Sequence, residues 1–247
     1  MIQTMIFDLD GTLVQTERLK ARSYARAAVE LCPRVISEEE VVEAYKGVVG
    51  RSRQEVAQAF IDRFDLGAKA AARMTEFGVT TPWEAFVGVR LRYYEAMVAD
   101  PAVVRAYQWP YRVALLRQAR QNRCKIALAT TSRRKQALHI LHALGLDDAF
   151  DVIATADDVA RTKPDPEVYH RVLDALDAAP ADSLALEDSP AGVAAARAAG
   201  VWCIAVTTDF TREALHRAAL LASRWIVDDP ENLMNVVQEM INEQAGD

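Results

Sequence analysis

The chain has 247 residues, of which 51% are hydrophobic and 26% charged, and its formal net charge is −6. This composition is typical of a globular protein with a sizeable core and excludes a disordered or fibrous chain. The acidic balance argues against a nucleic-acid-binding face, and no apolar run approaches the ~20 residues of a membrane span. We therefore expect neither nucleic acid nor a membrane as a partner.

The three cysteines, Cys32, Cys124 and Cys203, lie far apart and form no CxxC pair. This spacing indicates neither a disulfide framework nor a zinc site. The first residues show no signal-peptide pattern and run directly into an apolar stretch. Together these features predict a cytoplasmic protein, and they carry no signal of its oligomeric state.

Six short, mainly apolar runs predict strands. They lie at residues 4–8, 124–130, 150–155, 183–187, 201–206 and 225–227. Near-continuous apolar runs of this length suit strands that are buried on both faces of a parallel sheet. Helical spacing separates several of them, at residues 112–120, 134–144 and 191–199. This alternation predicts an α/β fold whose core is a doubly wound, Rossmann-like parallel sheet.

One region interrupts this alternation. Residues 15–99 contain little strand signal, and three pairs there have the spacing of capping boxes: Ser37 with Glu40, Ser52 with Glu55, and Thr81 with Glu84. We expect residues 15–99 to form an all-helical subdomain inserted after the first strand. Residues 1–14 and 100–247 would then make up the core.

Polar residues follow the predicted strands. Asp8-Leu9-Asp10-Gly11-Thr12 follows the first, Thr130-Thr131-Ser132 the second, and Glu187-Asp188 ends the fourth, while Lys163 lies in the loop after the third. Ligands of open parallel sheets bind beyond the carboxyl ends of the strands. We therefore expect these carboxylates, hydroxyls and the lysine to meet at one edge.

This collection of groups suits phosphate chemistry. Carboxylate oxygens favour Mg²⁺, and a phosphate would meet Lys163 and the hydroxyl of Thr130. Asp8 is placed to attack phosphorus, and Asp10 to donate and accept the proton. Two simpler interpretations stay open: Glu187 as a neighbour of the metal ligands, and Ser132 as the cap of the following helix, a role that we expect it to fill in part.

These motifs, in this order, resemble the four signature motifs of the haloacid dehalogenase superfamily. The inserted helices and Asp188-Ser189-Pro190-Ala191-Gly192 resemble its beta-phosphoglucomutase-like phosphatase branch. The resemblance implies that Asp8 is the nucleophile, that Asp10 is the acid/base, and that Thr130 and Lys163 hold phosphate. It implies metal ligands at Asp8, Asp10 (through its main-chain oxygen) and Asp188, with Glu187 close by.

The resemblance also makes the insertion a cap that carries substrate-binding residues. Residues 47–53 resemble the substrate-specificity loop of the branch, and the branch usually has a histidine where this chain has Lys20. The candidate substrate-binding residues are Thr130, Thr131, Ser132, Lys163, Gly50, Arg51, Arg53 and Lys20.

The expected function is that of a Mg²⁺-dependent phosphatase acting on a small phosphomonoester, with a sugar phosphate as the expected substrate. Phosphoryl transfer of the beta-phosphoglucomutase type is the first alternative, although Lys20 in place of histidine disfavours it. A catalytically silent metabolite-binding or signalling module is the second. Metal-dependent turnover of a phosphate ester would separate the enzyme from the silent module.

Overall fold

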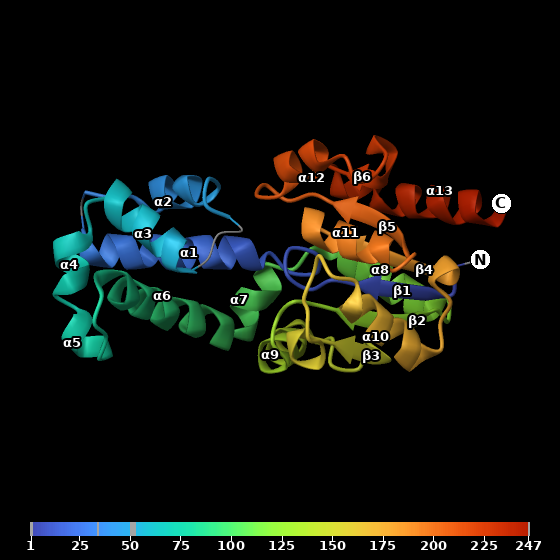
Figure 1. Cartoon of the computed structure of the whole chain (residues 1–247), viewed down its shortest axis with the longest axis horizontal. Coiled ribbons are helices and arrows are strands. Elements are labelled where there is room, and N and C mark those ends of the chain that lie inside the picture. The colour runs from blue at the N-terminus through green and yellow to red at the C-terminus, as the bar shows by residue number, and fades with distance from the viewer. Residues whose placement is uncertain (1, 34, 50–52, 247) are drawn as a thin grey trace. The chain divides into compact units, whose positions relative to one another are not determined.

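The chain folds into two compact units. The structure, a computed structural model, describes residues 2–33, 35–49 and 53–246. The first unit comprises Met1–Gln15 and Val104–Asp247, and the second comprises Thr16–Val103, so the second is inserted into the first (Figure 1). None of the helices in the described residues is long and apolar enough to cross a bilayer.

The first unit is built on a six-stranded sheet in which all neighbouring strands pair in parallel. The strands are β1 (Thr4–Phe7), β2 (Lys125–Ala129), β3 (Val152–Ala154), β4 (Ser183–Glu187), β5 (Trp202–Val206) and β6 (Ile226–Val227). Their order across the sheet is β3-β2-β1-β4-β5-β6. The order reverses next to β1, as a doubly wound sheet requires, and the predicted fold class is confirmed.

Helices follow the strands of this unit. They are α8 (Pro110–Gln121), α9 (Arg134–Leu144), α10 (Glu167–Leu176), α11 (Pro190–Ala198), α12 (Arg212–Ala218) and α13 (Leu233–Gly246). Consecutive residues of a strand point to opposite faces of the sheet, and Ile126 and Ala127 of β2 are both fully buried, so both faces of the strand are covered. This burial explains why the strands read as continuous apolar runs.

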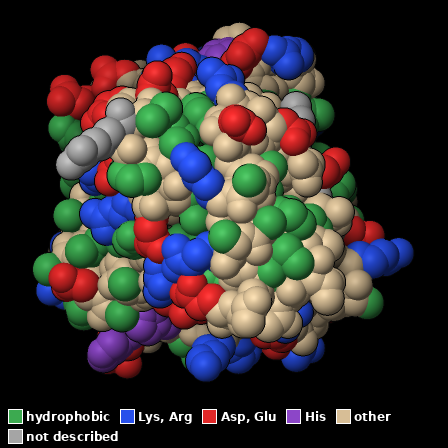
Figure 2. All heavy atoms as spheres, turned by 90° about the vertical axis from the view of Figure 1, so that its left-hand side faces the viewer, with side chains coloured by type: hydrophobic (Ala, Val, Ile, Leu, Met, Phe, Trp, Pro, Cys, Tyr) green, Lys and Arg blue, Asp and Glu red, His purple; other side chains and the backbone are tan. Residues whose placement is uncertain are grey.

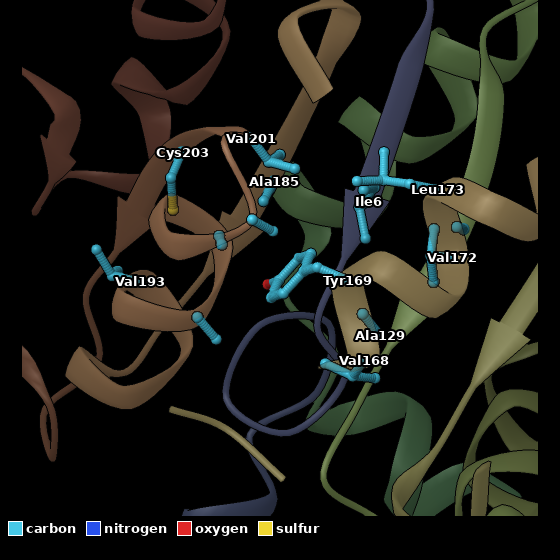
Figure 3. Close-up of a cluster of buried hydrophobic side chains, with 14 of the residues drawn as sticks. Ile6, Ala129, Val168, Tyr169, Val172, Leu173, Ala185, Val193, Val201 and Cys203 are labelled. Atoms are coloured by element: carbon cyan, nitrogen blue, oxygen red, sulfur yellow. The ribbon is translucent and has the colours of Figure 1, made fainter. Parts of the chain in front are cut away.

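One face of the sheet packs against α10 and α11. Figure 3 shows the ring of Tyr169, from α10, among side chains of the sheet and α11, including Ile6, Ala185 and Val193. Tyr169 is fully buried even though its hydroxyl is polar. A buried hydroxyl needs a hydrogen-bond partner, and that partner lies in the candidate site.

The second unit is entirely helical in its described residues. Its helices are α1 (Thr16–Leu31), α2 (Glu38–Tyr45), α3 (Arg53–Arg63), α4 (Gly67–Ala71), α5 (Met74–Phe77) and α6 (Pro82–Ala99), and α7 (Pro101–Ala106) runs across the boundary between the units. The capping boxes at Ser37 and Thr81 are formed, whereas Ser52 lies outside the described residues. The all-helical insertion is therefore confirmed.

The core of the helical unit is aromatic. The ring of Tyr24 lies 5.3 Å from that of Phe60 and 5.8 Å from that of Phe86, centroid to centroid. Such tilted and edge-on pairs are favourable beyond the area that they bury. On the face of the molecule that Figure 2 shows, basic and acidic side chains are intermixed.

Candidate active site

The register of the sheet brings the sequence motifs to one edge. Phe7, the last residue of β1, pairs with Leu128 of β2 and with Leu186 of β4. Asp8 follows Phe7 directly, so it lies level with the ends of both neighbouring strands. The main-chain N–H of Asp8 donates to the carbonyl oxygen of Leu186 at 3.1 Å, which fixes the start of the loop.

Asp8 and Lys163 form a buried ion pair, with Nζ of Lys163 2.8 Å from Oδ1 of Asp8. The same Nζ lies 2.6 Å from Oε1 of Glu187 and 2.8 Å from the carbonyl oxygen of Ala129. The side chains of Lys163 and Asp8 are only 3% and 7% exposed. Because an ammonium has three N–H groups, the three acceptors satisfy Lys163 completely.

The electrostatics of this pair follow from burial and neighbouring charge. Burial raises the pKa of the Asp8 carboxyl to about 7; the Lys163 ammonium opposes this rise, and Glu187 adds to it. Burial disfavours the charge on Lys163, yet attraction to Asp8 and Glu187 dominates and raises the pKa of the ammonium. Lys163 therefore stays charged at neutral pH.

The loop that carries Lys163 is held in place by Glu167 at the start of α10. Its Oε1 accepts from the main-chain N–H of Ala160 at 2.7 Å, and its Oε2 from that of Arg161 at 3.0 Å. These two bonds tie the loop to the helix that follows. The residues just before Lys163 are thus fixed to the start of α10.

Glu187 is held by Tyr169 as well as by Lys163. The hydroxyl of Tyr169 donates to Oε1 of Glu187 at 2.5 Å. The other carboxylate oxygen, Oε2, is buried and has no hydrogen-bond partner. A Cβ atom on Gly192 would lie 1.9 Å from that oxygen, so only glycine leaves room for it. Glu187 therefore keeps one buried carboxylate oxygen, next to Gly192, without a hydrogen-bond partner.

Asp188 is accommodated by a glycine in the same way. Gly11 has φ of +84°, in the left-handed region that favours glycine, and a Cβ there would lie 1.9 Å from Oδ2 of Asp188. The Gly11 of the DxDGT motif thus serves two needs at once, the turn after Asp10 and space for a carboxylate from β4.

These acids fit a small divalent cation. Asp8, Glu187 and Asp188 are all buried and offer carboxylate oxygens within 4.8 Å of one another. The three carboxylates outnumber the one ammonium group nearby, that of Lys163, so the cluster has an excess of acidic groups. In addition, Oε2 of Glu187 lacks a hydrogen-bond partner. An all-oxygen set of this charge suits Mg²⁺, which binds through one or two carboxylates and keeps several waters.

Asp10 is linked to the loop after β2. The hydroxyl of Ser132 donates to Oδ2 of Asp10 at 2.5 Å, and the main-chain N–H of Ser132 donates to Oγ1 of Thr130 at 3.0 Å. Thr130 is buried, whereas Thr131 is exposed. The structure therefore brings Asp10, Thr130 and Ser132 together and leaves the Thr131 side chain outside this group.

The expected capping role of Ser132 is wrong. The residue before α9 is Arg133, and its side chain forms no cap. Instead, Oδ2 of Asp157 accepts from the main-chain N–H of Arg134 at 2.9 Å. Because a carboxylate from another loop satisfies the helix start, the Ser132 hydroxyl is left to bond Asp10.

The remaining candidates belong to the helical unit or lie outside the described residues. Nζ of Lys20 lies 2.6 Å from Oε1 of Glu17, and the hydroxyl of Tyr45 donates to Oε2 of Glu17 at 2.8 Å. Arg53 is the exposed first residue of α3. Gly50 and Arg51 lie outside the described residues.

Sequence reasoning missed Tyr169 and Arg112. Tyr169 occupies an apolar position of α10, so its spacing marks it as core and says nothing of the carboxylate that its hydroxyl bonds. Arg112 is only 1% exposed and donates to the main-chain oxygen of Gly11. The sequence signal for Arg112 was its place at an apolar position of a predicted helix, where a charged residue is unusual.

Comparisons with known proteins identify the family of this chain. A family model of haloacid dehalogenase-like hydrolases matches residues 2–200. A validoxylamine A 7'-phosphate phosphatase from Streptomyces hygroscopicus subsp. limoneus is 32% identical over 90% of this chain and 93% of its own. A phosphorylated carbohydrates phosphatase from Thermotoga maritima is 28% identical over 97% of this chain and 100% of its own.

A similar solved structure is that of a CbbY variant from Rhodobacter sphaeroides in complex with xylulose-(1,5)bisphosphate. It has a TM-score of 0.59 and 26% identity, and the match covers 86% of this chain and 89% of that one. The likeness extends over both the strands and the inserted helices.

Proposed function

Since the chain belongs to the haloacid dehalogenase-like hydrolases, we propose that it is a Mg²⁺-dependent phosphatase that works through a phosphorylated Asp8. The observation that carries the proposal is the buried Asp8–Lys163 pair beside two further carboxylates, Glu187 and Asp188. A buried, charged lysine bonded to a carboxylate at a sheet edge suits the transfer of a doubly negative phosphoryl group.

In the first step, an oxygen of the Asp8 carboxylate attacks phosphorus, and the bond from phosphorus to the ester oxygen breaks. Asp10 donates its proton to the leaving oxygen, so that an alcohol departs. In the second step, Asp10 takes a proton from water, whose oxygen attacks phosphorus and releases phosphate from Asp8. General acid–base assistance of this kind contributes typically ~10²–10⁴-fold.

Other side chains prepare these steps. Lys163 neutralises charge on the phosphoryl oxygens, and the hydroxyl of Thr130 is a further donor. Ser132 holds the carboxyl of Asp10 through its 2.5 Å hydrogen bond and so limits the positions from which Asp10 can transfer a proton. A positioned acid–base group needs such support to be effective.

The carboxylates of Asp8 and Asp188 would hold Mg²⁺ together with the main-chain oxygen of Asp10, with Glu187 beside them. When bound, Mg²⁺ supplies charge stabilisation for the transferring phosphoryl group. The unpaired Oε2 of Glu187 supports a cation beside this cluster of carboxylates. We further propose that the inserted helices act as a cap that excludes bulk water during transfer.

The names of two relatives support a proposal for the substrate class. One acts on validoxylamine A 7'-phosphate and one on phosphorylated carbohydrates, by their names. We propose a small phosphorylated metabolite, a sugar phosphate or a close analogue, as the substrate. Phosphoryl transfer between sugar hydroxyls is the competing outcome, because a beta-phosphoglucomutase from Bacillus subtilis is also 26% identical.

The test measures phosphate released from p-nitrophenyl phosphate and from a panel of sugar phosphates, with Mg²⁺ and with excess EDTA. We expect Mg²⁺-dependent release, its loss in Asp8→Asn, and a roughly 10²–10⁴-fold slower rate in Asp10→Asn. Asp148→Asn, which changes an exposed aspartate of the same unit, is the control and should retain full activity. Full activity in Asp8→Asn would overturn the proposal.

The mutase is tested separately with glucose monophosphate and a glucose bisphosphate primer. The proposed function predicts that free phosphate accumulates. Isomer formation without free phosphate would replace hydrolysis by transfer, with Asp8 keeping its role.

A further inference from the structure

A cysteine and a lysine of the helical unit lie in direct contact. Nζ of Lys69, on α4, lies 2.7 Å from Sγ of Cys32, the residue that follows α1. The contact joins α4 to the end of α1, 37 positions away along the chain (Figure 1). Cys32 is only 6% exposed, whereas Lys69 is exposed. The sulfur is thus covered by protein, while the side chain that contacts it is open to solvent.

The pairing of these two groups points to reactivity. A neutral thiol is a weak hydrogen-bond acceptor, whereas an ammonium stabilises a thiolate, the form of cysteine that reacts with oxidants. Within the described residues the ammonium of Lys69 forms no ion pair with a carboxylate, and Sγ of Cys32 is the acceptor that it contacts. The C-terminal end of α1 opposes a thiolate with a partial charge of about half an elementary charge, less than the full charge of Lys69.

The other two thiols of the chain lack such a neighbour. Cys124 and Cys203 are free, and in the described part of the chain no lysine nitrogen contacts either sulfur. Burial raises the pKa of both thiols, that of Cys203 well above its usual value. Both belong to the other unit, so Cys32 has no second thiol in its own unit with which to form a disulfide. The amine of Lys69 is the nucleophile beside it.

We propose that Cys32 and Lys69 form a peroxide-sensitive modification site, in which one oxygen atom comes to bridge Sγ and Nζ covalently. The 2.7 Å between these atoms suits such a bridge, because two bonds that meet at one small atom span a distance of this size. A direct bond between sulfur and nitrogen would need the two atoms to approach much more closely. The N–O–S bridge would join α1 to α4.

Hydrogen peroxide supplies the oxygen and accepts the electrons. In the first step the thiolate sulfur attacks peroxide, an S–O bond forms and the O–O bond breaks. The departing hydroxide takes a proton from the ammonium of Lys69, which leaves a sulfenic acid beside a neutral amine. In the second step an N–O bond forms between Nζ and the sulfenic oxygen, and each of these atoms gives up one hydrogen. The nitrogen is oxidised, and a second peroxide is reduced to two waters.

Mass spectrometry of the full chain after peroxide treatment tests the proposal. The bridge adds one oxygen and removes two hydrogens, and tryptic mapping should join the peptide that carries Cys32 to the one that carries Lys69. We expect this product in the wild type and its loss in Lys69→Arg, which keeps the charge but replaces the amine. Excess dithiothreitol should restore the original mass, because reduction returns the thiol and the amine and releases water.

A second lysine of the helical unit offers the matched control. Nζ of Lys46 lies 2.6 Å from Oε2 of Glu43, so it faces a carboxylate instead of a thiol. Lys46→Arg should form the bridge as the wild type does. A product with sulfinic acid at Cys32 and a free amine at Lys69, or a bridge formed equally in Lys69→Arg, would overturn the proposal.

The melting temperature gives an independent readout. A bridge between residues 37 positions apart closes a loop in the unfolded chain, so the oxidised wild type should melt roughly 5 °C or more above the reduced protein. Cys32→Ser, treated with the same peroxide, should show no rise, and this control accounts for oxidation of methionines. A bridged protein that melts no higher than Cys32→Ser would contradict the proposed link between the helices. None of these measurements needs a substrate, so they stay decisive even if the chain hydrolyses no phosphoester.

Discussion

The guanidinium of Arg112 donates a hydrogen bond to the main-chain oxygen of Gly11, the residue that follows Asp10. Its other terminal nitrogen donates to the main-chain oxygen of Thr207 at 2.7 Å. Arg112 also stacks on the ring of Trp109, 4.1 Å from its centre. A single buried side chain from α8 therefore ties the loop of the proposed acid/base to the end of β5.

Replacing Arg112 should separate stability from catalysis. Arg112→Met leaves two buried carbonyl oxygens without donors, at about 1–3 kcal/mol each. The same variant also removes a buried positive charge, and this removal favours folding. Burial disfavours that charge, as the pKa of Arg112, which burial lowers to about 9, indicates. These effects have opposite signs and similar size, so we expect the unfolding free energy to change by less than about 2 kcal/mol.

In the same variant the loop after Asp10 loses the hydrogen bond from Arg112 to the main-chain oxygen of Gly11. We therefore expect kcat to fall about tenfold to a hundredfold while KM changes little. Urea unfolding and steady-state kinetics measure the two quantities. Arg117→Met, on an exposed position of α8, is the control. A kcat equal to that of the wild type would show that Arg112 does not position the loop.

A methyl group at Gly192 should disturb Glu187 without straining the backbone. The added Cβ would lie 1.9 Å from Oε2 of Glu187, which Lys163 and Tyr169 hold in place. We expect Gly192→Ala to lower the unfolding free energy by about 1–3 kcal/mol, the usual cost of overpacking, and to weaken Mg²⁺ binding.

Gly67 offers the matched control, because the nearest atom to a Cβ there is 3.9 Å away. Gly67→Ala should change the stability by less than about 0.5 kcal/mol. Urea unfolding measures the unfolding free energy of both variants, and calorimetric titration with Mg²⁺ measures their affinity for the metal. Equal stability of both variants would mean that Glu187 moves aside freely.

Removing the hydroxyl of Tyr169 tests the bond to Glu187. Tyr169→Phe keeps the packing of the ring and removes only the donor, so we expect a loss of about 1.5–3 kcal/mol in unfolding free energy, as for a hydrogen bond to a charged group. Tyr111→Phe removes a similar bond, 3.0 Å to Glu231 at the surface, and should cost less than about 0.5 kcal/mol. Thermal or urea unfolding in EDTA distinguishes them, and similar losses would contradict the buried bond.

Glu30 predicts a pH-dependent contribution to stability. Partial burial disfavours its charge, but hydrogen bonds from Tyr93, Arg92 and Arg73 outweigh this and lower the pKa of Glu30 to about 2. Because the folded pKa lies below the unfolded value of about 4.3, the contribution is fully present above pH ~5 and is lost as the pH falls towards 2.

We therefore expect Glu30→Gln to be less stable by about 1–2 kcal/mol at neutral pH, with the difference shrinking between about pH 5 and 2. Urea unfolding at a series of pH values follows both proteins. Glu239→Gln, at an exposed position of α13, should show no such trend. A difference that is constant over this range would rule out the ionised carboxylate as its source.

The helices and strands could be predicted where local sequence patterns, apolar runs and helical spacing, determine them. The limits of β4 and α9 agree with the predicted residues 183–187 and 134–144, because apolar runs and helical spacing reflect burial directly. The contact of Ser132 with Asp10 joins residues 122 positions apart and has no local signal. Sequence reasoning therefore found the groups that meet at the sheet edge but not the hydrogen bonds between them.

The three acceptors around Lys163 have a consequence for ligand affinity. Since Asp8, Glu187 and the Ala129 carbonyl already occupy every N–H of the ammonium, an arriving anion can reach this nitrogen only by exchange with one of them. Its net gain is a difference between two strong interactions, so weak or singly charged competitors such as chloride are at a disadvantage against a doubly charged phosphate ester.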